Sequence, residues 1–592
     1  MYAHEVTMND VTPTEHEAEI TFGYIFMAFM VWIYNLRITF PNEDILLAYL
    51  DITACFRWPR INPDLVGAFG FLIGSMSIYF AANAMVFGSV TSASSWEPFR
   101  RVIQAAATAY FTNKGLKWKH KGLLDMVKWS PVAPEGTKYV SATPCSQNKG
   151  ITDEDGNLKP TPHHIYVDDN MMADTRSRMR DTLAAGIEAI FDVLGWPATH
   201  IRQCAISLKK WKLLYIMHRI VLLGLVFDTR EMTVGITDEY REEVVELLLQ
   251  WEGKKVFSVP EIEKLIGKIG RIGQAFRPIY HLMPHLYSSA AFALRDNKSF
   301  LVSTSAAFRK LIKEAKRDAR EATEQDIKQI NFAVGQLSRR QHRLKREYVV
   351  PVSLENELKA ILGLIKDSTI RLASPLAHIV PRDPNYLSAA DSCKTAGGGW
   401  SKCLRFWWHL AYKKEVVRRA RLPNNKHGKL ISINVLEFVC VIINFAAAIY
   451  AIHVDGGSTD MFPVLCNWCD NTAACAWVNY KCKQSLIGRR LALLFVGLLL
   501  STNLGIQAEW ISTLYNFIAD DISRFKNEKS HESTFDYSSL LSSYPTQLQG
   551  CRQFIPSDKL LSLIWSVLLD GLSPDPLMIK EWKPEMLGHF GS

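Results

Sequence analysis

The chain has 592 residues, 48% of them hydrophobic and 21% charged. This composition is typical of a globular protein, and the length excludes a single hydrophobic core and predicts several domains. The formal net charge of +9 favours a polyanionic partner. The eleven cysteines are odd in number and irregularly spaced, which excludes a disulfide framework and predicts an intracellular protein of the cytoplasm, the nucleus or both.

The first nineteen residues are acidic and polar and lack the basic region of a signal peptide. An apolar run follows at residues 20–36, at the short limit for crossing a bilayer. A similar run at 438–452 lies within a stretch that otherwise has a soluble α/β pattern. We therefore expect buried core elements and no membrane partner, with a membrane anchor at 20–36 as the alternative.

Three carboxylates follow strand-like stretches in the first half of the chain. Asp51 ends the apolar run "ILLAYLD", and Asp168 and Asp169 stand side by side in "HHIYVDDNMMAD", at the expected tip of a hairpin. Adjacent carboxylates repel each other unless divalent cations lie between them. The three side chains therefore predict a two-metal site for phosphoryl transfer, and the alternative is an Asp-rich turn.

Residues 101–160 are polar, basic and rich in turn residues, and we expect a surface insertion there. Within it, Lys117, Trp118 and Lys119 combine cations with an aromatic surface that suits single-stranded nucleic acid. A solvated loop is the equal alternative for these three residues.

Helical periodicity begins near residue 238, and Ser258 and Glu261 have the spacing of a capping box before an amphipathic helix. A charge-rich stretch comes next and ends in "SRRQHRLKRE". Its cations Arg339, Arg340 and Arg343 are candidates for neutralising phosphates.

A mixed α/β pattern from 386 to 525 contains four further carboxylates: Asp391, Glu437, Asp470 and Asp520. Each also has a structural interpretation. Glu437 has the spacing of a partner for an Asn434 cap, Asp470 stands where a helix N-cap would, and the other two are compatible with loops. Cys466 and Cys469 lack a second ligand pair at zinc spacing, and we expect them in the strand before Asp470.

The motifs of the first half resemble those of reverse transcriptases. Tyr166-Val167-Asp168-Asp169 resembles the [YF]xDD signature, and residues 51–56, "DITACF", are similar to the D-x-x-x-[AC]-[FY] motif. Residues 87–99 resemble the segment that lines the nucleotide pocket, and residues 207–211 and 222–234 resemble the lysine-bearing and Leu-Gly segments that lead into the thumb.

This resemblance implies that Asp51, Asp168 and Asp169 hold two Mg²⁺ ions, with Mn²⁺ as a substitute. It also implies that Lys209 or Lys210 protonates the leaving pyrophosphate. The implied nucleotide pocket has Phe56 under the incoming sugar and consists of Ile52, Phe56, Phe87 and Gly88.

The second half resembles a ribonuclease H domain, whose four-carboxylate series matches Asp391, Glu437, Asp470 and Asp520. Asp520 is preferred over Asp521 because the family pattern "N…AD-x-LSR" then aligns with Asn516, Ala519 and 523–524. The resemblance implies two Mg²⁺ ions at this second site, which activate a water for cleavage of RNA.

Together the motifs are most similar to the polyprotein of DIRS-type retrotransposons, which use a tyrosine recombinase. The fold class implied is multidomain α/β: a right-hand polymerase palm with an RRM-like antiparallel sheet, a helical thumb, and a ribonuclease H-like mixed-sheet domain. The expected boundaries are an N-terminal segment of partial fingers or an apolar helix at 1–37, a palm at 38–235, a thumb at 236–300, a basic connection at 301–385, a ribonuclease H-like domain at 386–525, and a linker with a small helical tail at 526–592.

The implied activity is RNA- and DNA-directed DNA synthesis with ribonuclease H activity. The implied partners are an RNA template, a DNA primer, an RNA–DNA hybrid and dNTPs. Basic fingers motifs are not recognisable before Asp51. The alternative is therefore a catalytically impaired or domesticated nucleic-acid-binding scaffold.

Overall fold

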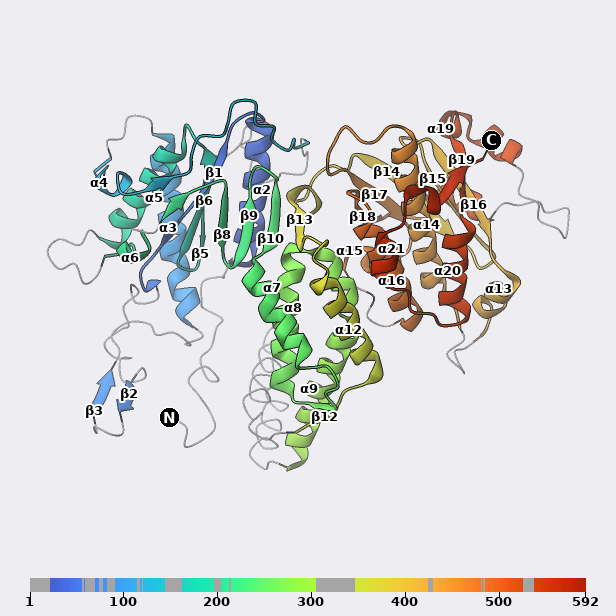
Figure 1. Cartoon of the computed structure of the whole chain (residues 1–592), viewed down its shortest axis with the longest axis horizontal. Helices are drawn as coiled ribbons and strands as arrows, with labels where there is room; N and C mark the ends of the chain where they lie inside the picture. Colours follow the sequence, from blue (N-terminus) through green and yellow to red (C-terminus); the bar gives the residue numbers. More distant parts are fainter. Residues whose placement is uncertain are drawn as a thin grey trace, which may run out of the picture. The chain divides into compact units, whose positions relative to one another are not determined.

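The computed structural model describes residues 22–55, 58, 70–73, 78–81, 91–113, 118–119, 121–143, 162–195, 204–211, 214–304, 346–423, 430–480, 482, 485–524 and 537–591. One compact unit comprises Met1–Thr237, Lys298–Arg343 and Ile379–Arg382, and a second comprises Asp238–Asn297, Leu344–His378 and Asp383–Ser592. Both units are mixed α/β structures with helices and sheets (Figure 1).

The first unit contains α2 (Phe22–Thr39), β1 (Ile45–Asp51), β2 (Gly70–Ile73), β3 (Ile78–Ala81), α3 (Thr91–Thr112), α4 (Lys121–Leu124), β4 (Lys128–Trp129), β5 (His163–Tyr166), β6 (Asp169–Thr175), α5 (Met179–Leu194), α6 (Leu208–Trp211), β7 (Tyr215–Ile216), β8 (Arg219–Leu222), β9 (Leu225–Asp228) and β10 (Thr233–Ile236).

An antiparallel sheet of order β1-β6-β5 forms the centre of this unit. His163 and His164 are neighbours on β5, so their side chains point to opposite faces. A Cβ on Gly186 of α5 would lie 2.7 Å from the His163 ring, and the His164 ring lies 5.4 Å from that of Phe29 on α2. Helices α5 and α2 therefore cover opposite faces of the sheet.

The apolar run at the N-terminus forms helix α2, which is a core element as expected. Its side chains Trp32, Ile33 and Leu36 are buried, and Trp32 Nε1 donates a hydrogen bond of 2.7 Å to the carbonyl of Ala173 on β6. Burial against the sheet accounts for the apolar composition without a bilayer.

The surface insertion expected from residue 101 is wrong for its first part. Residues 101–112 complete helix α3, where Ile103 and Ala107 are buried and which packs on α5 (Figure 1). The segment near 128–143 also lies on the unit, because β4 pairs with β7 and the Thr143 amide donates to the Tyr34 hydroxyl at 3.0 Å.

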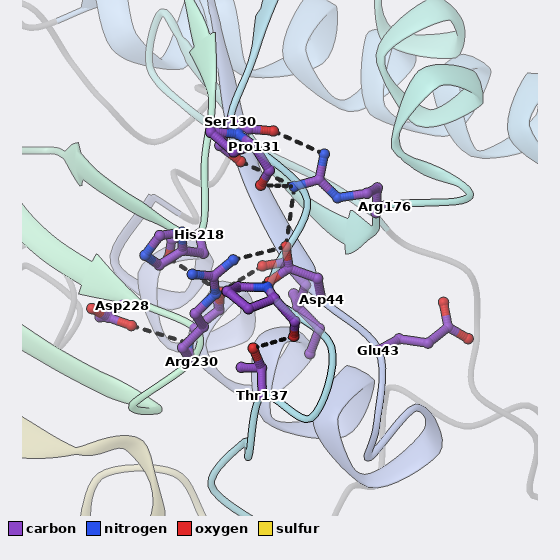
Figure 2. Close-up of polar contacts among 12 residues, drawn as sticks. Glu43, Asp44, Ser130, Pro131, Thr137, Arg176, His218, Asp228 and Arg230 are labelled. Atoms are coloured by element: carbon purple, nitrogen blue, oxygen red, sulfur yellow. Dashed lines mark hydrogen bonds and ion pairs between the residues drawn. The ribbon is translucent and has the colours of Figure 1, made fainter.

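A polar network holds the start of β1 (Figure 2). Asp44 accepts hydrogen bonds from Arg176 and Arg230 at 3.1 Å, and Arg176 also donates to the carbonyls of Ser130 and Pro131. Burial alone would raise the pKa of Asp44, but these hydrogen bonds and the two positive charges outweigh it and lower the pKa. The network ties β1 to residues near 130, 176 and 230.

The second unit contains α7 (Asp238–Leu249), β11 (Val256–Phe257), α8 (Val259–Ala275), η4 (Arg277–Leu282), α9 (Pro284–Thr304), β12 (Tyr348–Val349), α12 (Val352–Lys366), β13 (Ala373–Pro375), η6 (Leu376–His378), β14 (Tyr386–Ser392), β15 (Ala396–Ser401), β16 (Phe406–Ala411), α13 (Lys414–Ala420), α14 (Ile433–Val454), β17 (Val464–Cys469), α15 (Thr472–Asn479), α16 (Leu486–Leu500), β18 (Gly505–Trp510), α17 (Phe517–Arg524), α18 (Tyr537–Ser543), α19 (Pro545–Leu548), β19 (Arg552–Pro556), α20 (Asp558–Leu569), α21 (Pro576–Lys580), η7 (Pro584–Met586) and β20 (Gly588–Phe590).

The helices α7, α8, α9 and α12 form one part of this unit (Figure 1). The predicted capping box is confirmed: Ser258 and Glu261 bond reciprocally at the start of α8. Arg241 of α7 donates to the carbonyls of Ile365 and Asp367 at 2.7 Å, where the last carbonyls of α12 need partners.

A seven-stranded mixed sheet has the order β18-β17-β14-β15-β16-β19-β20. Strand β15 lies close to helices on both faces because it contains glycines. A Cβ on Gly397 would lie 2.3 Å from Cys440 of α14, and one on Gly398 would lie 2.4 Å from Ile522 of α17. Helices α14 and α17 therefore pack on opposite faces of the sheet.

Helix α14 is long and apolar enough to cross a membrane, with a mean hydropathy of 2.3 over its most apolar window, yet 89% of that window is buried inside the protein. It packs on β14 and β15. The apolar run at 438–452 is therefore a core helix, as expected.

The C-terminal residues are more than the expected linker and helical tail. Strand β19 pairs with β16 in parallel and β20 pairs with β19, so residues 552–590 extend the sheet (Figure 1). Leu560 and Ile564 of α20 are buried in the same core as α14. The boundary expected at 525 thus divides one sheet, because the strands that complete it lie far along the chain from their partners.

Candidate active sites

The first site lies at the end of β1, where the register of the sheet brings two carboxylates together. Asp51 is the cross-strand partner of Asp169 on β6, and Asp168 is in the turn that joins β5 to β6. The Ile52 amide donates to the Asp168 carbonyl at 2.8 Å, which places the turn beside the end of β1. The hairpin and the strand expected from the sequence therefore bring all three carboxylates together.

The hairpin turn has an unusual backbone. Val167 has a φ of +57°, which is costly for a β-branched residue and needs support from its surroundings. Trp96 of α3 supplies such support, because its Nε1 donates to the Val167 carbonyl at 2.7 Å. Trp96 is fully buried and was not singled out in the sequence, although it lies within the 87–99 segment.

Partial burial and nearby negative charge disfavour the charged forms of Asp168 and Asp169. Burial, followed by the charge of Asp168, raises the pKa of Asp169 to about 6. Burial, with the charge of Asp51, also raises the pKa of Asp168. Carboxyl groups held close together in this way bind a cation more strongly than separated ones, because the cation relieves the repulsion.

The two candidate lysines differ in position. Lys210 Nζ lies 2.5 Å from Asp51 Oδ1, and this hydrogen bond raises the pKa of the lysine. Lys209 is exposed in the same turn of α6. Backbone bonds from Ser207 N to Asp51 O and from Thr53 N to Ala205 O fix α6 beside the end of β1.

Three other residues predicted at the nucleotide and nucleic-acid sites lie in the described part of the chain. Ile52 is buried and forms a bridge with Ile206. Trp118 Nε1 donates to Asp181 at 3.3 Å, and Lys119 Nζ lies 3.4 Å from Asp192, so both contact α5. The remaining candidates lie outside the described residues: Phe56, Phe87, Gly88, Lys117, Arg339, Arg340 and Arg343.

The second site brings together the four carboxylates of the other unit from four elements. Asp391 is on β14, Glu437 on α14, Asp470 directly after β17 and Asp520 on α17. Strands β14 and β17 are parallel neighbours, so Asp391 and Asp470 lie at the same end of the sheet. Asp391 and Glu437 are buried.

The charges of these groups act on one another. Burial, followed by the charges of Asp470 and Asp520, raises the pKa of Asp391 to about 6, although Ser523 Oγ donates to its Oδ2 at 2.5 Å. Burial, with the charges of Asp391 and Asp470, raises the pKa of Glu437 to about 9. At this pKa the carboxyl group of Glu437 is protonated at neutral pH.

Helix capping, the structural alternative for Glu437 and Asp470, is wrong for both residues. Ser432 is the N-cap residue of α14, and the Asn434 side chain accepts a hydrogen bond from Asn471. Asn471 caps α15 by accepting from the Ala474 amide, so Asp470 is not its cap. The Asp470 carboxylate instead accepts from Thr513 Oγ1 at 2.7 Å.

The choice between Asp520 and Asp521 follows from their neighbours. Asp520 forms an ion pair of 2.7 Å with Arg524, and its charge contributes to the raised pKa of Asp391. Asp521 is exposed and accepts a hydrogen bond from Tyr544. Among the described residues, Asp520 is thus the one that belongs to the cluster.

Both sites present groups of carboxylate oxygens. The first offers three carboxylates and the second four, and hard oxygen donors of this kind suit Mg²⁺ and Mn²⁺. Burial first, and neighbouring carboxylates second, raise the pKa values of Asp169, Asp391 and Glu437.

No model of a protein family matches the chain, and no curated protein matches it. Among solved structures, the foamy viral protease-reverse transcriptase in complex with RNA/DNA hybrid is 11% identical, with 83% of this chain and 46% of that chain covered and a TM-score of 0.32. The dRH form in complex with double-stranded DNA is 11% identical, with 85% and 61% covered and a TM-score of 0.32. The chain thus spans less than two thirds of the length of these two proteins, and at this TM-score the likeness is coarse.

Proposed function

We propose that the chain is an RNA- and DNA-directed DNA polymerase with ribonuclease H activity, encoded by a retrotransposon of the DIRS type. The observation that carries the proposal is the pair of separate carboxylate clusters, one on the β1-β6-β5 sheet and one on the seven-stranded sheet. An isolated Asp-rich turn would not be joined by a carboxylate from a second strand with a lysine beside it.

At the first cluster, the proposed substrates are a DNA primer on an RNA or DNA template and a dNTP. Two Mg²⁺ ions would be held by Asp51, Asp168 and Asp169, and when bound they would neutralise charge on the triphosphate and lower the pKa of the primer hydroxyl. The Trp96 hydrogen bond to Val167 holds the turn that carries Asp168. Lys210 keeps a positive charge at Asp51 and is the better placed of the two lysines to give a proton to pyrophosphate.

At the second cluster, the proposed substrate is the RNA strand of an RNA–DNA hybrid. Asp391, Glu437, Asp470 and Asp520 would hold Mg²⁺ ions there. Ser523 orients Asp391 and Thr513 orients Asp470 through the hydrogen bonds given above. Glu437 must lose its proton when a cation binds, so binding of metal should release a proton.

The experiment is primer extension on an RNA template together with cleavage of a labelled RNA–DNA hybrid, each with Mg²⁺ and with Mn²⁺. Metal-dependent activity in both assays supports the proposal. A folded protein that binds the hybrid but performs neither reaction with either metal would favour the alternative, a nucleic-acid-binding scaffold.

A further inference from the structure

Cys469 lies within the carboxylate cluster of the second site. Ligand atoms of Glu437, Cys469 and Asp470 all lie within 4.8 Å of one another. The three residues come from α14, the last position of β17 and the residue after it. We propose that they form a site for a thiophilic divalent cation of the Zn²⁺ class, with the Cys469 thiolate as a ligand.

The geometry suits a tetrahedral ion. Cys469 Sγ lies 3.8 Å from Glu437 Oε2. Zinc bonds of about 2.3 Å to sulfur and about 2.1 Å to oxygen give a tetrahedral edge of about 3.6 Å. The separation of Sγ and Oε2 is therefore close to one edge of a tetrahedral zinc site.

Strand pairing and a hydrogen bond fix the backbone of Cys469. Cys469 pairs with Trp510 in the register of β17 and β18, and the Ile511 amide donates to its carbonyl at 3.1 Å. Cys466, three positions earlier, points to the other face of the strand, so it is not part of the group. The site thus differs from a paired-cysteine zinc site.

Whether Cys469 Sγ binds the ion depends on which ion is present. Mg²⁺ selects oxygen ligands and leaves the thiol protonated, whereas Zn²⁺ accepts both sulfur and carboxylate. Binding of Zn²⁺ would replace the thiol proton, which leaves to solvent.

Glu437 and Asp470 also belong to the proposed Mg²⁺ set, so the two kinds of ion would compete. This competition rests on the proposed ribonuclease function, whereas the Zn²⁺ site itself rests on the geometry alone.

The test is a Co²⁺ titration of the full chain at pH 7.5, monitored by sulfur-to-cobalt charge-transfer absorption in the near ultraviolet. We expect a band in the wild type that is lost on addition of Zn²⁺, and excess Mg²⁺ should shift the Co²⁺ titration to higher concentration without producing a band of its own. The Cys469→Ser variant should lack that band. The matched control is Cys475→Ser, which removes a second buried thiol whose Sγ lies 3.8 Å from the Cys469 carbonyl, and it should keep the band.

An equal band in Cys469→Ser would overturn the proposal, because another cysteine would then be the ligand. Glu437→Gln provides a second test if the serine variant does not fold. It should keep the band but weaken Zn²⁺ affinity by about tenfold or more, and an unchanged affinity would also overturn the proposal.

The absorption does not depend on catalysis. A wild type that shows the band but cleaves no hybrid contradicts the proposed function and supports the metal site. A wild type that cleaves hybrids with Mg²⁺ but shows no band contradicts only the metal site.

Discussion

Asp51 and Asp169 are direct cross-strand partners in the register of β1 and β6. Like charges in this arrangement destabilise a sheet. The unfavourable pair lies at one end of β1, where Lys210 contacts Asp51 and the backbone of the Asp168 turn bonds to Ile52. Unfavourable charge placed at the end of a buried strand is what a cation site requires.

Replacing Asp169 with Asn should stabilise the metal-free protein. The folded pKa of about 6 is above the unfolded value, so ionisation of Asp169 lowers stability as the pH rises from about 4 to 6. In EDTA at pH 7.5 we expect Asp169→Asn to gain about 1 to 2 kcal/mol, because solvent screens part of the charge. Urea unfolding measures this gain, and it should vanish below pH 4. Equal stability of the two proteins at both pH values would contradict the raised pKa of Asp169 in the folded protein.

The two lysines of α6 provide a matched pair of variants. Lys210→Met removes the ammonium beside Asp51 and should slow primer extension by about a hundredfold. Lys209→Met changes an exposed neighbour in the same turn and should leave the rate within about twofold, as is usual for an exposed position. Single-turnover extension measures both rates. Equal losses in the two variants would contradict the assignment to Lys210.

Glu437→Gln should separate the two activities. Because burial raises the pKa of Glu437 to about 9, glutamine resembles the protonated side chain already present at pH 7, and stability should change by less than about 1 kcal/mol. Hybrid cleavage should be lost and primer extension retained. Glu415→Gln, at an exposed ion pair on α13, is the control and should retain both activities. Loss of extension in a folded Glu437→Gln protein would contradict independent sites.

Asp44→Asn tests the network in Figure 2. Removing one partner of a nearly buried ion pair should destabilise the protein by about 3 kcal/mol at pH 7. The lowered pKa of Asp44 means that its contribution is present above the unfolded value and is lost as the pH falls through the folded value. Glu43→Gln, beside it on the chain and in contact with Ser177, is the control in thermal unfolding and should cost little. Equal effects of the two variants would contradict the role given to the network.

The strand that ends at Asp51 and the hairpin at Asp168 could be predicted from the sequence, because a continuous apolar run and the carboxylates beside it are local patterns. The same is true of the capping box at Ser258. The support that Trp96 gives to Val167 could not be predicted, because it joins a helix to a distant turn.

Non-local pairing also explains the errors in domain boundaries. Strand β19 has a strand-like composition, but its place in the sheet depends on β16, much earlier in the chain. The packing of helix α3 on α5, which depends on a segment much later in the chain, distinguishes residues 101–112 from a surface insertion.

The most direct test of the account is extension of a DNA primer on an RNA template by the wild type and by Asp168→Asn, with Mg²⁺ and with Mn²⁺. The substitution keeps the shape of the side chain and removes one charge from the proposed cation site. We expect metal-dependent extension by the wild type and a loss of at least about a thousandfold in the variant. Extension by Asp168→Asn at the wild-type rate would contradict the assignment of the polymerase site.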